Sequence, residues 1–131
     1  MWEYNTTPEF IKSSEELGLS QLVLDSLENW AITIYRVQTP KTKCCFRSPN
    51  NKFEIWIARI PDPDSNKGCS GGFRLVYFFI LEKNSIYLDR IERRNDLGGK
   101  RERPRDQQKF NSYFMELKKY LMDKIESLGN H

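Results

Sequence analysis

The sequence predicts an α+β fold, in which an antiparallel or mixed sheet of about four strands carries a helical hairpin on one face and an added C-terminal helix. Three observations lead to this prediction. Residues 71–94 form two β-branched and aromatic runs separated by a polar break, which is typical of an antiparallel β-hairpin. Residues 8–34 and 106–129 instead repeat apolar residues every three or four positions, the spacing of helices that bury one face.

Local signals indicate the N-terminal elements. Residues 2–6 alternate weakly and suit a short first strand. Thr7-Pro8 is typical of a helix start, a capping hydroxyl followed by proline in the first turn, and Gly18 ends that helix. Ser20 is placed to cap a second helix, whose apolar stripe comprises Leu22, Val23, Leu27, Trp30, Ala31 and Ile34. Because about two residues join the helices, we expect them to lie antiparallel across one sheet face, with their acids outward.

The remaining strands come from the middle of the chain. Residues 38–52 contain two prolines and no periodicity, which indicates a long loop. Residues 53–60 form the next strand, and Pro61 ends it. The β-hairpin of residues 71–94 follows, with residues 82–85 as its connection. It is the most apolar part of the chain, so we expect it at the centre of the sheet.

Arg74 is the one residue that does not fit this apolar β-hairpin. It follows a diglycine by two positions and lies in a strand that otherwise carries no charge. An unpaired guanidinium is costly to bury. Arg74 therefore has a carboxylate partner or faces something anionic.

The C-terminal part is expected to be a basic linker at residues 98–105 and a helix at residues 106–129. Asp106 is placed to cap that helix. Its apolar stripe comprises Phe110, Phe114, Leu117, Leu121, Ile125 and Leu128, and the lysines Lys118, Lys119 and Lys124 fall outside the stripe. With 131 residues, the chain is expected to form a single domain, residues 1–131, around one core.

Composition indicates a reducing compartment and no membrane. No segment approaches the roughly 20 apolar residues that span a bilayer, and the start of the chain lacks the features of a signal peptide. The three cysteines, Cys44, Cys45 and Cys69, make a poor disulfide framework and are expected to be free thiols. We therefore expect a cytoplasmic protein.

Charge is segregated along the chain. Residues 1–35 carry six acids against one lysine, a balance of −5, and residues 36–59 carry six bases against one acid, a balance of +5. Residues 93–109 carry seven bases against three acids, a balance of +4. The two basic stretches flank the β-hairpin in sequence. They indicate either a positive sheet surface suited to a polyanion or a pair of solvated loops, and both readings stay open.

Several enzyme classes are excluded by residue type. The only histidine is the terminal His131, so no Ser-His-Asp or Cys-His arrangement is available. The cysteines lack metal-ligand spacing, and Gly71-Gly72 precedes a strand where phosphate-binding glycine motifs precede a helix. We expect no metal, cofactor or small-molecule substrate. Arg, Lys, Tyr and Glu remain, a set that can hold a phosphodiester and stabilise a phosphorane, which points toward RNA.

The element order, the glycine-aromatic-Arg-apolar-apolar-Tyr segment of residues 72–77 and a closing strand that ends in Arg93-Arg94-Asn95 resemble one known group. They are similar to the RelE/ParE superfamily of bacterial toxins, especially its HigB-like and RelE-like branches. The resemblance covers about residues 2–97, the expected core of a RelE-like domain, and HigB-like members also carry a C-terminal helix after a polar linker.

The resemblance implies a toxin of a type II toxin-antitoxin system that enters the ribosomal A site and cleaves mRNA. In the RelE branch the arginine equivalent to Arg74 contacts the scissile phosphate, and the basic residue equivalent to Arg94 stabilises the transition state. A 2′-hydroxyl attacks the phosphate, so no metal is required. Lys52, Arg59, Arg93 and Arg47 are the residues expected to position the RNA. The expected partners are the ribosome, mRNA and a cognate antitoxin with an acidic segment.

Some positions depart from the family pattern. The strand before the β-hairpin lacks the alternating lysines of RelE-type members, and the last strand carries Asp89 and Arg90 where apolar residues are usual. No tyrosine follows Arg94 before Tyr113, so the tyrosine acid or base of the RelE branch has no clear counterpart.

Glu54 and Glu92 are therefore either the acid or base, or ion-pair partners of Arg74 or Arg94. Two alternatives to the nuclease stay open. One is a ParE-like gyrase poison, and the other is a RelE-fold interaction protein without toxicity.

Overall fold

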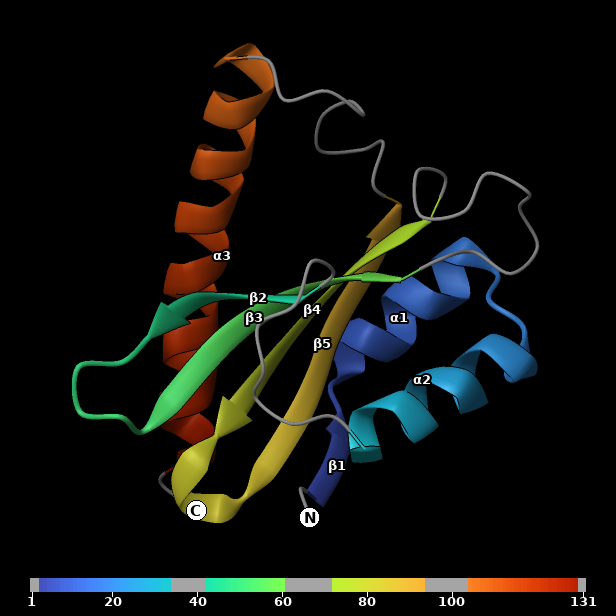
Figure 1. Cartoon of the computed structure of the whole chain (residues 1–131), viewed down its shortest axis with the longest axis horizontal. Helices are drawn as coiled ribbons and strands as arrows, with labels where there is room; N and C mark the ends of the chain where they lie inside the picture. The colour runs from blue at the N-terminus through green and yellow to red at the C-terminus, as the bar shows by residue number, and fades with distance from the viewer. Residues whose placement is uncertain (1–2, 34–41, 61–71, 94–103, 130–131) are drawn as a thin grey trace.

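The computed structural model describes residues 3–33, 42–60, 72–93 and 104–129. Along the chain, one described strand precedes a helical hairpin, the other described strands follow it, and a long helix comes last (Figure 1). In chain order the elements are β1 (Glu3–Thr6), α1 (Pro8–Leu17), α2 (Gln21–Thr33), β2 (Thr42–Arg47), β3 (Phe53–Ile60), β4 (Phe73–Ile80), the 3-10 helix η2 (Leu81–Lys83), β5 (Ser85–Arg93) and α3 (Pro104–Gly129).

The described strands form one mixed sheet in the order β1-β5-β4-β3-β2. β1 pairs with β5 in parallel, and the other neighbouring strands are antiparallel. The predicted β-hairpin is confirmed as β4 and β5, joined by η2, and β4 lies in the middle of the sheet. The α+β class is therefore confirmed.

The expectation of about four strands was wrong, because the described sheet has five. The additional strand is β2, which forms one edge of the sheet inside the segment expected to be a loop. A bulge between Cys44 and Phe46 interrupts its register with β3. A bulged residue breaks the two-residue alternation that reveals a strand in a sequence. This segment is a strand because it pairs with β3, and the residues of the segment alone do not indicate that pairing.

The helical hairpin begins and ends where its capping residues indicated. Thr7 Oγ1 accepts a hydrogen bond from the Phe10 amide at 3.2 Å, and Pro8 follows in the first turn of α1. Gly18 ends α1 with a left-handed φ of 66°, a conformation that costs glycine little. Ser20 Oγ accepts a hydrogen bond from the Val23 amide at 3.4 Å, so the predicted cap of α2 is confirmed.

Each face of the sheet carries its own hydrophobic layer. α1 and α2 cover one face, and α3 covers the other (Figure 1); we call these the α1/α2 face and the α3 face. Buried sheet residues of the α1/α2 face are Trp56, Ala58, Phe73, Leu75, Tyr77, Phe79, Ile86, Leu88 and Ile91. Those of the α3 face are Ile55, Ile57, Val76, Phe78 and Ile80. The side chains of β3 and β4 therefore alternate between the two layers, as strands require.

Helix α3 begins two residues before the cap predicted at Asp106, at Pro104. Proline suits the first turn of a helix because no amide donor is needed there, so the helix extends into the expected linker at residues 98–105. Its buried residues Leu117, Leu121 and Ile125 belong to the predicted stripe. Three such side chains contribute roughly 5–9 kcal/mol when buried, which anchors this half of α3 on the sheet.

The described helices are amphipathic. None of them is long and apolar enough to cross a membrane. Cys44 and Cys45 carry no disulfide, as expected. Positions named in the sequence analysis that lie outside the described residues are Ile34, Pro61, Cys69, Gly71, Arg94, Asn95 and His131, together with the side chains of Asp106 and Phe110.

We expect Leu121→Ala to lower the free energy of unfolding by about 2–5 kcal/mol, because it leaves a cavity between α3 and the sheet. Leu121 is fully buried, whereas Met115 on the same helix is 72% exposed. Met115→Ala is therefore the matched control, expected to stay within about 0.5 kcal/mol of the parent. Urea unfolding of both variants measures this. Equal stability of the two variants would contradict the packing of α3 on the sheet.

Candidate functional site

Three charged residues form a row across the sheet at one end of the α3 face. Arg59 of β3 lies directly opposite Arg74 of β4, and Arg74 lies opposite Glu92 of β5. Residues directly opposite on neighbouring strands project to the same face, with Cβ atoms about 5 Å apart. Val76 and Phe78 follow Arg74 at two-residue steps and pack beneath α3. The row therefore lies on the α3 face, and we call it the charged row.

The charged row combines two guanidinium groups with one carboxylate. Like charges directly opposite each other on a sheet repel, and the single charge of Glu92 offsets only one of the two arginines. The remaining positive charge suits an anion such as a phosphate, which guanidinium groups bind in bidentate fashion. Arg59 is exposed and Arg74 is half-buried, with its Nη1 atom enclosed by the protein.

A bulge in β5 decides which side chains join the charged row. Relative to β4, β5 gains one residue, Asp89, between Leu88 and Arg90. Such an insertion resets the alternation of the strand. Asp89 and Arg90 consequently both face α3, whereas Ile91 returns to the layer under α1 and α2. Glu92 then takes the position opposite Arg74.

Arg90 is a further cationic residue near the charged row, and the sequence analysis did not select it. Its Nε donates to Asp89 Oδ2 at 3.2 Å, and its guanidinium lies 5.4 Å from the centre of the Tyr120 ring. Burial lowers the pKa of Arg90, but its interactions with Asp89, Tyr113 and Glu92, including the hydrogen bond to Asp89, together outweigh burial and leave the pKa raised. The signal available in the sequence was the charged pair Asp89-Arg90 inside an apolar strand.

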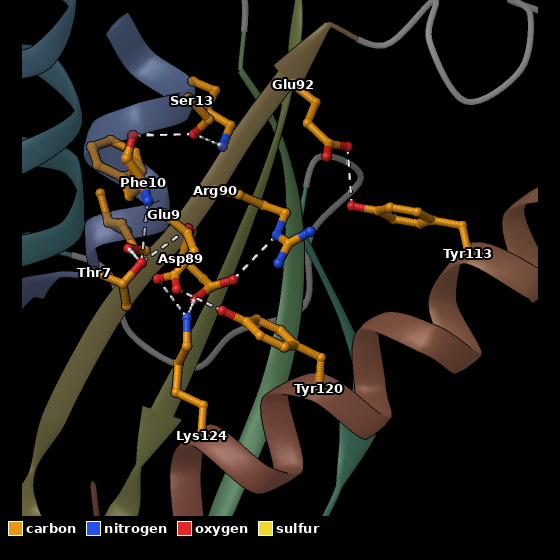
Figure 2. Close-up of polar contacts among 12 residues, drawn as sticks. Thr7, Glu9, Phe10, Ser13, Asp89, Arg90, Glu92, Tyr113, Tyr120 and Lys124 are labelled. Carbon is orange, nitrogen blue, oxygen red and sulfur yellow. Dashed lines mark hydrogen bonds and ion pairs between the residues drawn. The ribbon is translucent and has the colours of Figure 1, made fainter. Parts of the chain in front are cut away.

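Helix α3 adds a tyrosine to this end of the sheet. Tyr113 Oη donates a hydrogen bond to Glu92 Oε2 at 3.0 Å (Figure 2). Burial, and next the charge of Glu92, raise the pKa of Tyr113, so the hydroxyl remains a donor at neutral pH. Sequence reasoning found no tyrosine close after Arg94, and only the packing of α3 on the sheet brings Tyr113 to β5.

Four residues join α1, β5 and α3 next to Arg90, and we call them the Lys124 clamp. Lys124 Nζ lies 2.7 Å from Glu9 Oε2 and 2.7 Å from Asp89 Oδ1. Tyr120 Oη donates to Glu9 Oε1 at 2.6 Å, and Figure 2 shows these side chains converging from the three elements. The side chain of Asp89 is completely buried, and the ammonium of Lys124 offsets the cost of enclosing its charge.

The expected position of Lys124 outside the buried stripe was wrong, since its side chain is only 17% exposed. A lysine has a long apolar stem, which lets its ammonium reach past the edge of its own helix. Burial lowers the pKa of Lys124, but the hydrogen bonds to Asp89 and Glu9 outweigh it and leave the pKa raised. Lys124 is therefore charged.

Glu54 lies on the α1/α2 face, away from Arg74. Its Oε2 accepts a hydrogen bond from Arg47 Nε at 2.7 Å, and its Oε1 accepts one from Trp56 Nε1 at 3.1 Å. Its side chain is 1% exposed. Glu54 thus forms an ion pair with Arg47, and its pairing with Arg94 stays a prediction because Arg94 lies outside the described residues.

The other predicted site residues are spread over the molecule. Arg93 pairs with Phe73, and its guanidinium lies 5.2 Å from the centre of that ring, which belongs to the α1/α2 layer. Lys52 is exposed next to the start of β3, whereas Arg59 is near the end of that strand. Arg94 lies outside the described residues, so its pairing with Arg74 stays a prediction.

The thiol of Cys45 also belongs to the α3 face. Burial raises its pKa to about 11, although the charges of Lys43 and Arg74 act in the opposite direction. A thiol with this pKa is protonated at neutral pH and is a poor nucleophile. Cys45 therefore gives no reason to assign thiol chemistry to the site.

The chain matches no protein-family model and no curated protein. It is similar to the crystal structure of a metal-bound toxin from Helicobacter pylori, with 20% sequence identity and a TM-score of 0.44 over 75% of this chain and 100% of that one. A similarity at this level assigns neither a family nor an activity.

We expect the contribution of Glu9 to stability to disappear in acid. The hydrogen bonds from Lys124 and then Tyr120 lower the pKa of Glu9 from 4.5 to about 2. A lowered carboxyl pKa stabilises the fold fully above the unfolded value, and this gain is lost as pH falls from 4.5 toward 2. Because Glu9 is 39% exposed, solvent screens the contact and the effect is modest.

The measurement compares urea unfolding of the parent and of Glu9→Gln at several pH values. The parent should be more stable at neutral pH, and the difference should shrink across that acidic range. Glu16→Gln, at an exposed position of the same helix, is the control and should show a smaller difference at every pH. A difference between parent and Glu9→Gln that does not change with pH would contradict the Lys124 clamp.

Proposed function

We propose that the chain is the toxin of a type II toxin-antitoxin system and acts as a ribosome-dependent mRNA endonuclease that inhibits translation. The observation that carries the proposal is the direct pairing of Arg59 with Arg74 on one sheet face, with Arg90 and Glu92 on β5 beside them. It supports the role that the resemblance implies for Arg74, contact with the scissile phosphate.

The proposed reaction is an attack within the RNA strand. The 2′-oxygen of a ribose forms a bond to the adjacent phosphorus, and the bond from phosphorus to the 5′-oxygen of the next nucleotide breaks. The products are a cyclic phosphate and a 5′-hydroxyl. Negative charge builds up on the phosphorane oxygens, where guanidinium groups stabilise it more than they stabilise the starting phosphodiester. Arg74 and Arg59 take this role in the described part of the chain, and Arg94 remains the further candidate.

Glu92 is the described carboxylate next to Arg74 in strand register, which makes it the candidate to accept the proton of the 2′-hydroxyl. Its hydrogen bond from Tyr113 holds the carboxylate in one orientation. Glu54 is a poorer candidate, because it is buried on the opposite face in an ion pair with Arg47. Proton transfer requires contact with the substrate.

The proposed partners are the ribosome with its mRNA and a cognate antitoxin. An antitoxin with an acidic segment would neutralise the arginines of the charged row, so its complex should weaken as salt rises. Within the row this chain supplies one acid, Glu92, whereas exposed acids such as Glu15 and Glu16 lie on α1.

One observation favours a second candidate function. Arg74 is half-buried and its neighbour Glu92 is in contact with α3, an arrangement that also suits an interaction protein of the same fold without nuclease activity. A gyrase poison of the ParE type is the remaining alternative. Primer extension on cellular mRNA separates these candidates, since only the nuclease creates new 5′ ends within codons.

We expect Arg74→Ala and Arg59→Ala each to relieve growth arrest when the chain is expressed without an antitoxin. Removing one group that stabilises a transition-state oxyanion lowers kcat by roughly 100- to 1,000-fold, and cleavage of mRNA on purified ribosomes measures this. Lys12→Ala is the matched control, because it removes one positive charge from an exposed position on α1. The control should cleave like the parent.

Circular dichroism of each variant tests whether the fold is intact. Growth arrest that persists in folded Arg74→Ala would contradict the nuclease proposal. A parent chain that arrests growth without new 5′ ends would favour the gyrase poison. A parent chain that does not arrest growth would favour the interaction protein.

A further inference from the structure

Access to Arg74 is restricted in this structure, which the proposed function alone does not explain. The Nη1 atom of Arg74 is enclosed, although its strand neighbour Arg59 is exposed. A phosphate must reach the guanidinium directly to be bound in bidentate fashion. The Nη1 atom of Arg74 can therefore take part in such a contact only if some part of the protein moves.

The part of α3 that carries Tyr113 contacts the Glu92 end of the charged row. Tyr113 is half-buried and its hydroxyl donates to Glu92, the residue directly opposite Arg74. Figure 2 shows the Tyr113 side chain reaching from α3 to Glu92. The Tyr113–Glu92 hydrogen bond thus connects the helix to the charged row itself.

We propose that the turn of α3 around Tyr113 is an internal gate, which closes the Arg74 end of the charged row through the hydrogen bond to Glu92 and opens to admit an RNA phosphate. This inference rests on the proposed function for the identity of the ligand. The gate itself rests on the burial of Arg74 and the position of Tyr113.

The two halves of α3 are held to the sheet with different strength, which limits the motion to the Tyr113 end. Leu117, Leu121 and Ile125 are buried in the α3 face, and the Lys124 clamp lies beside them. Before Leu117, the described side chains are exposed or only half-buried. Releasing three buried apolar side chains costs more than releasing one hydrogen bond and the two half-buried rings of Tyr113 and Phe114. The gate therefore opens by lifting the Tyr113 turn while the rest of α3 stays in place.

Opening also changes the charge that a ligand meets. In the closed state Glu92 accepts a hydrogen bond from Tyr113 and stands next to Arg74 and Arg90. An arriving phosphate competes with Glu92 for these guanidinium groups, because both are oxygen anions of similar size. Phosphate binding and release of the Tyr113–Glu92 contact consequently favour each other.

Two variants that make the same chemical change on the same helix test the gate. Tyr113→Phe removes the hydrogen bond to Glu92 and keeps the ring and the net charge. Tyr120→Phe removes the hydrogen bond to Glu9, at the Lys124 clamp. Urea unfolding and circular dichroism establish that both variants keep the fold.

The first measurement is the rate at which phenylglyoxal labels Arg74, read by mass spectrometry against exposed Arg59 in the same chain. We expect Tyr113→Phe to label Arg74 about 10-fold faster than the parent, since a lost hydrogen bond to a charged group shifts an opening equilibrium by about that factor. Tyr120→Phe should label Arg74 at the parent rate. Equal rates in Tyr113→Phe and the parent, or an equal increase in both variants, overturns the gate.

The second measurement is fluorescence anisotropy with a labelled single-stranded oligouridine. Tyr113→Phe should bind it about 10-fold more tightly than the parent, because the binding-competent fraction rises, and adding Arg74→Ala should remove the gain. Weaker binding by Tyr113→Phe overturns the gate. Binding that does not depend on Arg74 overturns the proposed function instead, and the labelling rates then judge the gate independently.

Discussion

The position of α3 depends on a buried carboxylate in addition to its buried apolar side chains. Asp89 is completely enclosed, and an enclosed carboxylate without a cation would cost several kcal/mol. Lys124 supplies that cation from α3 at 2.7 Å, and Arg90 supplies a second from the same strand. Because Lys124 also contacts Glu9, one ammonium group ties the C-terminal helix to strand β5 and to the first helix.

The bulge at Asp89 links this ion pair to the candidate site. It places Asp89 and Arg90 on the same face in succession, which an unbroken strand cannot do. Every later residue of β5 changes face as a result, so Glu92 comes to lie beside Arg74 and below Tyr113. The residue that anchors α3 is therefore also the residue that assembles the charged row. A change at the bulge would alter helix position and site together.

The two faces of the sheet divide the charged residues named from the sequence. Arg59, Arg74 and Glu92 lie on the α3 face, where the arginines leave a positive surface. Glu54 and Arg47 form an ion pair on the α1/α2 face. A phosphodiester at the charged row would thus contact residues from β3, β4 and β5, and α3 would control its approach.

The sequence by itself determined most of the elements. Capping residues such as Thr7, Gly18 and Ser20 act within one turn of their own helix, and the apolar runs of β4 and β5 carry the signal of a buried strand within a few residues. Arg74 also stood out locally, as the one charged residue in that apolar strand. The sequence did not indicate β2, because a bulge interrupts its alternation and because its strand conformation comes from pairing with β3.

Only the tertiary structure decided which charged residues share a face. A shift of one residue in strand register moves every later side chain to the other side of the sheet, and the charged pair Asp89-Arg90 does not by itself show that a bulge occurs there. The contacts of Tyr113 with Glu92 and of Lys124 with Asp89 join residues from separate elements. Local patterns extend over a few residues, whereas these contacts arise when a helix packs on a sheet, and that is why the site could be named in part but not assembled from the sequence.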